Sequence, residues 1–254
     1  MSNLSLLILT KNEQENLKKW AEWLPKLTVI NEIVAVDDNS TDDTKKILKS
    51  FESTNLKINI FDRGVNGNFA SQRNFAITKA KNDWVLFIDA DEIPSPKLIN
   101  LLNSLKLNEN YCYSIKRYLV YCNHILYHGI SATDRPVRLF NKNLSKFIKP
   151  VHEVLVSKNK IININQPLFH YSAPNLKTFL SKLNHYSTIR AQELFNQKTK
   201  ANLLDIIFYP KAKFIQYYIW HLGFLDGVAG LIICLSLAFY SFLVRSKLWR
   251  LYHA

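Results

Sequence analysis

The chain has 254 residues, of which 48% are hydrophobic, and its formal net charge is +13. This composition allows a sizeable core, argues against a disordered chain and favours anionic partners such as phosphorylated substrates or an anionic membrane surface. The basic residues are spread along the chain, which argues against a nucleic-acid-binding protein. Three cysteines without a C-x-x-C pair argue against a disulfide framework or a zinc site, and fit a reducing compartment.

Strand-like and helix-like segments alternate over the first hundred residues. Short apolar runs predict strands at 4–9, 33–36, 56–61 and 84–88, and the segments between them predict helices at 13–24, 41–51 and 69–80. Pro25 is expected to end the first helix. Helices between strands at this spacing predict parallel pairing and a layered α/β sheet.

The pattern changes after Pro94. A helix is expected at 96–105, strands at 111–121, 137–140 and 161–164, and a further helix from 174 to about 195. No linker or internal repeat interrupts this order. We therefore predict a catalytic domain over residues 1–172, with a nucleotide-sugar half at 1–100 and an acceptor half at 101–172. A C-terminal helical region then follows at 173–254.

The C-terminal region contains 18 uncharged residues, 227–244, between Asp226 and Arg245. That length is the lower limit for crossing a bilayer. Basic and aromatic residues on both sides of the run are typical of a membrane interface. We expect a membrane-associated segment at about 222–244, which spans the bilayer or lies in its plane. A buried core helix and an oligomer seam are the alternatives.

Two of the predicted strands end in acidic residues, Asp37-Asp38 and Asp89-Ala90-Asp91. The carboxyl ends of parallel strands meet at one edge of a sheet, where ligands of open α/β sheets bind. Carboxylate oxygens suit Mg²⁺ or Mn²⁺ shared with a phosphate. The chain has no G-x-G-x-x-G turn and no Walker lysine loop, so we expect a metal to hold the phosphates. The alternative is a loop of solvated acids.

Four motifs resemble those of family 2 glycosyltransferases in sequence order. They are T-K-N-E at 10–13, V-D-D-N-S-T-D at 36–42, S-Q-R-N at 71–74 and F-I-D-A-D-E at 87–92. Members of that family are inverting enzymes with the nucleotide-diphospho-sugar fold called GT-A, a mostly parallel, Rossmann-like sheet flanked by helices. Further segments are similar to the bacterial branch that adds glucose to the inner core of lipopolysaccharide: R-L-F at 138–140, V-H-E at 151–153, F-H-Y at 169–171 and G-F-L-D-G at 223–227.

The resemblance implies roles for residues near the donor. Asp38 matches the acid that contacts the uracil base, and Thr10 and Glu13 match positions near the nucleotide. Asp91 matches the metal ligand of the D-x-D motif, while Asp89 matches the acid that faces the ribose or the metal and its water shell. Arg73 matches a motif position on the nucleotide-sugar side. Its alternative role is a salt bridge that fixes the helix at 69–80.

Acceptor-side roles are implied for a second group of residues. An inverting transfer needs a base that takes the proton of the acceptor hydroxyl. Glu153 is our candidate base and Asp134 its rival, although Glu153 could instead pair with a basic neighbour such as Lys149. His170 could be a further metal ligand. The residues that could bind acceptor phosphates are Arg135, Arg138 and His152, but the histidines could equally be structural, and Arg138 could only brace the sheet.

These observations predict an inverting glycosyltransferase that depends on Mg²⁺ or Mn²⁺. We expect it to move a hexose, glucose in the first instance, from a UDP-sugar to a lipid-anchored envelope glycan such as lipopolysaccharide core. It would act at the cytoplasmic face of the bacterial inner membrane, as a peripheral protein or with one C-terminal membrane helix. Two alternatives stay open: a phosphatase of the haloacid-dehalogenase type that uses the D-x-D motif, and a non-catalytic, membrane-bound nucleotide-binding scaffold. The sequence leaves the oligomeric state open.

Overall fold

The computed structural model describes residues 3–65, 67–149 and 153–253. Contacts divide the chain into two units. The first comprises Met1–Arg117 and Arg135–His170, and the second comprises Tyr118–Asp134 and Tyr171–Ala254. The first unit ends at His170, and residues 118–134, which the sequence assigns to the acceptor half, belong to the second unit.

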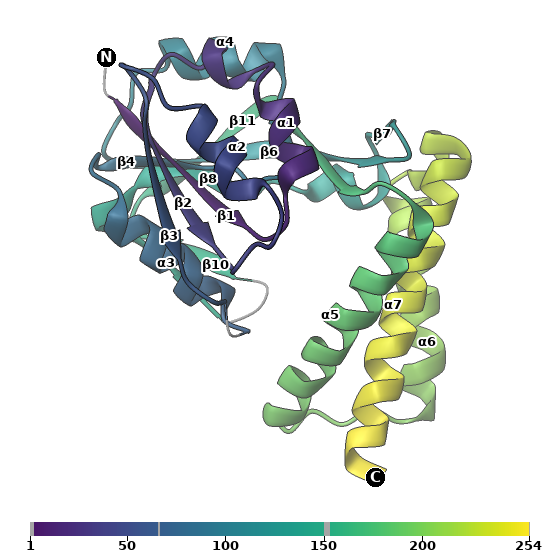
Figure 1. The fold of residues 1–254 in the computed structure, drawn as a ribbon. Coiled ribbons are helices and arrows are strands. Elements are labelled where there is room, and N and C mark those ends of the chain that lie inside the picture. The colour runs from purple at the N-terminus through teal and green to yellow at the C-terminus, as the bar shows by residue number, and fades with distance from the viewer. Residues whose placement is uncertain (1–2, 66, 150–152, 254) are drawn as a thin grey trace. The chain divides into compact units, whose positions relative to one another are not determined.

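A parallel sheet forms the centre of the first unit, as the sequence predicts (Figure 1). Its strands are β1 (Leu4–Thr10), β2 (Ile30–Asp37), β3 (Lys57–Asp62) and β4 (Trp84–Phe87). Their order is β3-β2-β1-β4, and every neighbouring pair among them is parallel.

Antiparallel strands extend this sheet beyond β4. They are β8 (Val137–Asn141), β6 (Tyr111–Tyr121), β11 (Lys160–Ala173) and β5 (Glu92–Pro94), in that order. The short β7 (His124–Leu126) pairs with the end of β6. A separate hairpin is formed by β9 (Ser145–Ile148) and β10 (Val154–Ser157). The mixed sheet carries acidic residues from both its parallel and its antiparallel part toward one another.

Helices cover both faces of the sheet because alternate strand side chains point to opposite faces. Leu6 and Ile8 of β1 enter a core with α1 (Gln14–Trp20), α2 (Thr44–Ser50) and α4 (Pro96–Ser104). Leu7 enters a second core with α3 (Phe69–Lys79) and the β9–β10 hairpin. The strands are therefore buried on both faces, as their continuous apolar runs predict.

The first predicted helix is shorter than expected. Helix α1 ends at Trp20, and Pro25 lies inside a separate 3-10 helix, η1 (Leu24–Lys26), rather than ending α1. The indole N–H of Trp20 donates to the carbonyl of Ala90 at 3.1 Å, and its ring packs on Trp23 with 4.8 Å between centroids. These buried contacts lie where the chain turns between α1 and η1. Strand β11 is also much longer than the predicted 161–164.

The second unit is mainly helical. It contains η2 (Gly129–Thr133), α5 (Leu176–Asn196), α6 (Leu203–Phe214), the π-helix η4 (Ile215–Trp220), η5 (Gly223–Asp226) and α7 (Gly227–His253). Helix α7 packs along both α5 and α6 (Figure 1). The segment Gly223–His253 is long and apolar enough to cross a membrane by length and composition.

Candidate donor-binding site

The acidic residues predicted to bind the donor lie at one edge of the sheet. In the parallel register Thr10 of β1 pairs with Asp37 of β2, and β4 runs alongside β1 in the same direction. Asp38 follows the end of β2 and Asp89 follows the end of β4. The two clusters therefore meet at the carboxyl ends of the strands, as expected.

Buried hydrogen bonds organise the loop after β2. Asp37 accepts from the Thr10 hydroxyl at 2.8 Å and from the backbone N–H of Ser40 at 2.7 Å, so Thr10 supports this loop. Asp38 accepts from Lys11 Nζ at 2.7 Å and from the backbone N–H of Val65 at 3.0 Å. Burial opposes ionisation of Asp38, but these hydrogen bonds and the Lys11 charge outweigh it and lower its pKa. Asp38 is therefore an ionised acceptor at this edge.

Glu13 follows the end of β1 in the first loop. Its carboxylate accepts from Asn16 Nδ2 at 2.7 Å, and its backbone N–H donates to the Thr44 hydroxyl at 2.8 Å. This second bond fastens the loop after β1 to the start of α2. Glu13 thus lies beside the Asp38 loop, at the predicted nucleotide side of the sheet.

Arginine side chains neutralise most of the acids that follow β4. Asp89 Oδ1 accepts from Arg73 Nη2 at 2.9 Å, and Asp89 Oδ2 accepts from Arg138 Nη2 at 2.6 Å. Arg138 also contacts Glu92, whose fully buried carboxylate accepts from Arg117 Nη1 at 2.8 Å. The cations that offset the repulsion between Asp89 and Glu92 are thus guanidinium groups of the chain itself.

Glu153 belongs to the same ionic cluster. Its Oε1 accepts from Arg73 Nε at 2.7 Å, so one guanidinium joins Glu153 to Asp89. Arg73 lies on α3 with its charge 4.4 Å from the Phe87 ring centroid and 5.4 Å from that of Phe147. Glu153 therefore pairs with a basic residue, as its alternative role required, but with Arg73 rather than with Lys149.

The cluster contains Asp89, Glu92 and Glu153 together with Arg73, Arg117 and Arg138, which gives three negative and three positive charges. Burial opposes ionisation of Asp89, but the charges of Arg138, Arg73 and Arg117 outweigh it and hold the pKa of Asp89 well below its ordinary value. Burial lowers the pKa of Arg138, but the negative charges of Asp89 and Glu92 raise it by more. Both ions therefore keep their charge. Arg138 is only 4% exposed, which is the placement expected if it braces the sheet.

Asp91 lies beside His170. The distance from His170 Nε2 to Asp91 Oδ2 is 3.3 Å, and both side chains are partly exposed. Antiparallel pairing of β5 with β11 brings them together, since His170 is opposite Glu92 in the register. This contact joins two predicted metal ligands that are 79 positions apart in the chain.

The pair fits a divalent cation that is shared with a phosphate ligand. Among the described residues, no three His, Cys, Asp or Glu side chains are placed to hold a metal. Mg²⁺ in nucleotide sites is commonly held by one or two protein ligands plus phosphate oxygens and water. Carboxylate oxygens suit Mg²⁺ and Mn²⁺, and a neutral imidazole nitrogen is a common metal ligand in proteins. Asp91 and His170 meet this requirement, while both oxygens of Asp89 are occupied by arginine.

The remaining predicted residues have other positions. Arg135 Nη1 lies 3.5 Å from the carbonyl oxygen of Ile164. Asp134 belongs to the second unit, where its backbone N–H donates to Ser131. His152 lies outside the described residues. Glu92 and Arg117 had no predicted role. Glu92 could have been found because it directly follows the D-x-D motif, whereas Arg117 lies in an ordinary strand pattern that gives no signal.

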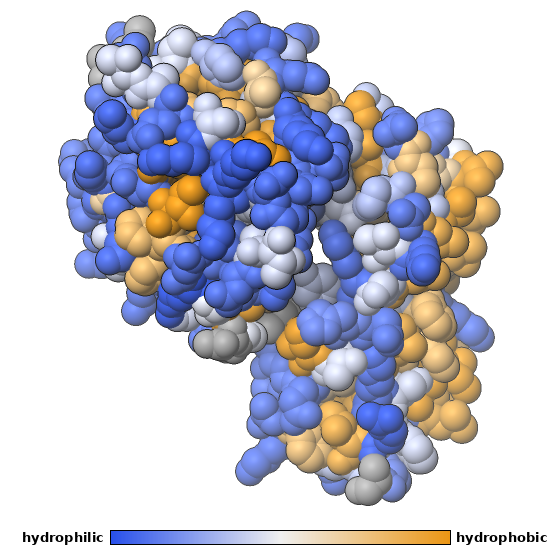
Figure 2. Space-filling view, viewed as in Figure 1, coloured by the Kyte–Doolittle hydropathy of each residue, from blue (hydrophilic) through white to orange (hydrophobic). Residues whose placement is uncertain are grey.

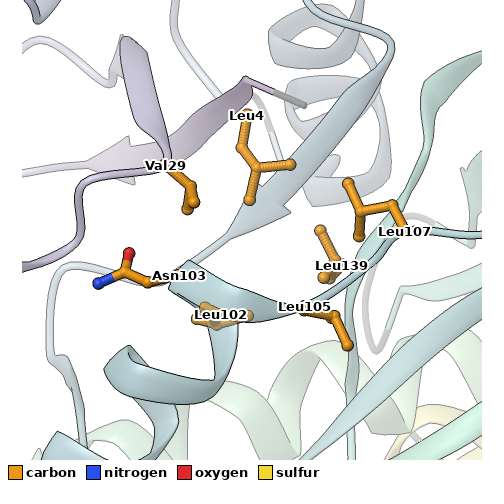
Figure 3. A pocket seen from close by; sticks show the side chains of 7 residues that line it. All are labelled: Leu4, Val29, Leu102, Asn103, Leu105, Leu107 and Leu139. Carbon is orange, nitrogen blue, oxygen red and sulfur yellow. The ribbon is translucent and has the colours of Figure 1, made fainter. Parts of the chain in front are cut away.

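A small apolar cavity lies elsewhere in the first unit (Figure 3). Its walls include Leu4, where β1 begins, and Val29, just before β2. The acids follow the carboxyl ends of these strands, so the cavity is at the opposite edge of the sheet. None of the described residues that line it is charged, which makes it unsuited to a nucleotide diphosphate.

Acid sensitivity provides a first test of the ionic cluster. A carboxyl group whose pKa is lowered by folding contributes stability above its unfolded-state pKa, and that contribution is lost as the pH falls below about 4. We therefore expect Asp89→Asn to reduce the slope of unfolding free energy against pH between about pH 5 and 2, as measured by urea denaturation. Asp83→Asn, at the other end of β4, is the matched control for the loss of one carboxyl group. Equal slopes for wild type and Asp89→Asn would contradict the pairing.

The chain is similar to known glycosyltransferases. The family model "Glycosyl transferase family 2" matches residues 5–164. An uncharacterized glycosyltransferase of Rickettsia typhi is 28% identical over 98% of this chain and 87% of its own length. The lipopolysaccharide core biosynthesis glycosyltransferase LpsC of Rhizobium meliloti is 26% identical over 97% of this chain and 92% of its own length.

The fold also resembles a solved enzyme. Glucosyl-3-phosphoglycerate synthase from Mycobacterium tuberculosis, in complex with Mn²⁺, UDP and glucosyl-3-phosphoglycerate, has a TM-score of 0.53 and 15% identity over 79% of this chain and 82% of that one. This likeness and the mixed sheet with flanking helices confirm the predicted GT-A fold.

Proposed function

We propose that the chain, which belongs to glycosyl transferase family 2, catalyses the inverting transfer of a hexose from a UDP-sugar to a lipid-anchored glycan of the bacterial envelope. The observation that carries the proposal is the contact of Asp91 with His170 at the carboxyl ends of the strands. Arginines neutralise Asp89 and Glu92, whereas Asp91 pairs with His170. A carboxylate and an imidazole that meet at this edge of the sheet are groups that could hold the cation of a metal–diphosphate complex.

The donor would lie along the carboxyl ends of β1, β2 and β4. Asp38 is our candidate for the uracil contact, since it is an ionised acceptor beside the predicted nucleotide motif. Thr10 and Glu13 would shape the loops around the nucleoside through their bonds to Asp37 and Thr44. The M. tuberculosis enzyme was solved with UDP and Mn²⁺, which supports this choice of nucleotide and ion.

Asp91 and His170 would hold the divalent cation. A bound Mg²⁺ or Mn²⁺ supplies Lewis-acid stabilisation of the negative charge that develops on the leaving diphosphate. Asp89 would act indirectly. Held by Arg73 and Arg138, it fixes the start of the D-x-D loop, and its backbone N–H donates to Glu92 Oε2 at 3.1 Å.

Glu153 would take the proton of the acceptor hydroxyl as that oxygen attacks the anomeric carbon. Its carboxylate is held by Arg73, which also holds Asp89, so the proposed base and the D-x-D loop share one positioning residue. Orientation by a fixed partner is what a general base requires. Asp134 stays the rival base.

The acceptor would be a lipid-linked glycan, supported by the name of the R. meliloti relative and by the apolar C-terminal helix. Arg135 and Arg138 are the described candidates to contact acceptor phosphates, although the burial of Arg138 favours a role in positioning Asp89. We place the enzyme at the cytoplasmic face of the inner membrane. Family membership argues against the phosphatase alternative. The geometry does so as well, because both oxygens of Asp89, which would be the phosphatase nucleophile, are bound to arginine.

A thermal-shift panel of nucleotides tests the donor and the ion together. Ligands that bind only the folded state stabilise it, by about 2.7 kcal/mol at a hundredfold excess over Kd. We expect UDP and UDP-glucose to raise the Tm only with Mn²⁺ or Mg²⁺, and GDP-mannose to have little effect. Asp91→Asn should abolish the metal-dependent shift, whereas Asp83→Asn should retain it.

Two outcomes would contradict the proposal. UDP stabilisation that persists unchanged in EDTA and in Asp91→Asn would exclude the metal role. Tight metal-dependent UDP binding without any UDP release from UDP-sugars, in the presence of bacterial envelope glycolipid, would favour the non-catalytic scaffold.

A further inference from the structure

Helix α7 exposes an apolar stripe along its whole length. Its exposed large apolar residues follow a spacing of 7, 4, 3 and 7 positions, which places them on one helix face: Val228, Leu235, Phe239, Phe242 and Trp249. The opposite face packs on α5, through contacts such as Ile233 with the Phe179 region and Leu248 with the Leu194 region. A soluble helix normally turns its apolar face to the core, so this stripe needs another cover.

Helix α6, which lies against α7, is more unusual. None of its twelve residues is buried, although most of them are apolar. Its most exposed apolar residues are Leu203 (69%), Leu204 (62%) and Phe208 (58%), and Trp220 at the end of η4 is 81% exposed. Figure 2 shows apolar residues gathered on the side of the helical unit where α6 lies. Contiguous exposed patches of this extent mark interaction surfaces.

Helix α5, on the other flank of α7, has a polar outer surface. Its exposed residues include Lys177, Lys182 and Gln192. Lys247 of α7 crosses to α5 and donates to the carbonyl oxygen of Asn184 at 2.7 Å and to the Ser187 hydroxyl at 2.8 Å. If α7 spanned a bilayer, α5 would enter the hydrocarbon with it, and charged side chains inside a bilayer are costly. The structure therefore disfavours a spanning α7.

The start of α7 is hydrogen-bonded to polar groups of the second unit, and its other end carries an exposed basic residue. Just before its start, Asp226 accepts from the backbone N–H groups of Tyr127 and His128 and lies 2.9 Å from His128 Nδ1. At its other end the chain continues through Trp249 and Arg250, which are exposed. Neither end can enter the hydrocarbon without carrying polar groups along.

Basic side chains accompany the apolar surface. Lys200, Lys211 and Arg250 are exposed, and Arg245 stacks on the ring of Tyr209 at 3.9 Å. Exposed tryptophans occur at both ends of the helix pair. Basic residues beside an amphipathic helix face are attracted to anionic lipid headgroups, and tryptophan favours the interface.

We propose that α6 and α7 lie in the plane of one leaflet of an anionic phospholipid bilayer, with α6 and the α7 stripe in the acyl–headgroup boundary and α5 in water. The charge of the surrounding residues selects an anionic bilayer rather than a second copy of this positively charged chain. This inference concerns how the protein is held at the membrane, and it stands apart from the transfer chemistry.

Depth measurements on the full-length chain test the proposal. Single cysteines replace Val228, Leu235, Phe242 and Trp249 in a Cys122→Ser background and carry spin labels. The protein is bound to vesicles of phosphatidylcholine with about one-third phosphatidylglycerol. Relaxation by oxygen and by a polar nickel complex then gives the depth of each label. We expect the same shallow depth at all four positions, because they lie on one stripe parallel to the surface.

Other outcomes would overturn it. Labels at 235 and 242 near the bilayer centre with shallow labels at 228 and 249 would show a span. Labels without lipid contact that broaden one another would show a second copy on the stripe. As an independent check, Leu235→Gln/Phe239→Gln should lower vesicle binding in flotation at least tenfold with unchanged circular dichroism, while Lys182→Gln on α5 should lower it less than twofold. Equal binding by phosphatidylcholine vesicles alone would contradict the anionic preference.

Discussion

Replacing Glu153 by glutamine is expected to lower kcat for sugar transfer by a factor of about 10² to 10⁴, which is the range that a positioned general base contributes. Glutamine keeps the size of the side chain, and its carbonyl oxygen can still accept from Arg73 Nε. What it loses is the capacity to take the proton of the acceptor hydroxyl. The measurement is the rate of UDP release from a UDP-sugar in the presence of acceptor.

Two controls separate chemistry from binding in that experiment. Metal-dependent UDP affinity should be unchanged in Glu153→Gln, because the change removes no predicted donor contact. Glu22→Gln, an exposed glutamate outside the site, should retain the wild-type rate. A kcat for Glu153→Gln within about threefold of wild type, far below the expected loss, would exclude Glu153 as base. A large loss in Asp134→Asn alone would transfer that role to Asp134.

Replacing Arg138 by methionine is expected to destabilise the fold by about 3–5 kcal/mol, the cost of leaving buried charge without its partner. Arg138 is almost fully buried between Asp89 and Glu92, and Glu92 has no exposed surface. Methionine fills much of the volume but donates no hydrogen bond. Urea denaturation at neutral pH gives the free energy of unfolding directly.

A second substitution shows whether the loss comes from uncompensated charge. Adding Glu92→Gln to Arg138→Met should recover part of the stability, because one buried carboxylate is then neutral. Lys160→Met, a change of an exposed cation on β11, should alter the stability by less than about 0.5 kcal/mol. Loss of stability in Arg138→Met equal to that in Lys160→Met would contradict the ionic cluster.

The parallel strands and the edge that carries the acids were predictable from local pattern. The apolar runs ending in Asp37-Asp38 and Asp89-Ala90-Asp91 are buried strands, and their direction alone brings the acids together. Helix α6 was predicted only as part of a C-terminal helical region and without bounds, because helical periodicity reveals an apolar face only when polar residues occupy the other faces. In α6 apolar residues lie all round, and none is buried.

The partners of the acids could not be read from the sequence. Arg73 lies 16 positions before Asp89, whereas Arg138 lies 49 positions after it and Glu153 lies 80 positions after Arg73. The contact of Arg138 depends on which antiparallel strand follows β4 in the sheet, and that order has no local signal. The motif identified the acids, and the fold decides that Asp89 binds arginine and that Asp91 meets His170.

The central claim is that Asp91 and His170, and not Asp89, hold the cation that neutralises the diphosphate. A crystal of the wild-type protein grown with UDP and Mn²⁺ tests it by anomalous scattering at the manganese edge. The account predicts one manganese at about 2.0–2.3 Å from Asp91 and His170, with Asp89 still bonded to Arg73 and Arg138. Manganese ligated by Asp89 with those arginine contacts broken, or UDP bound at the sheet edge without manganese, would contradict it.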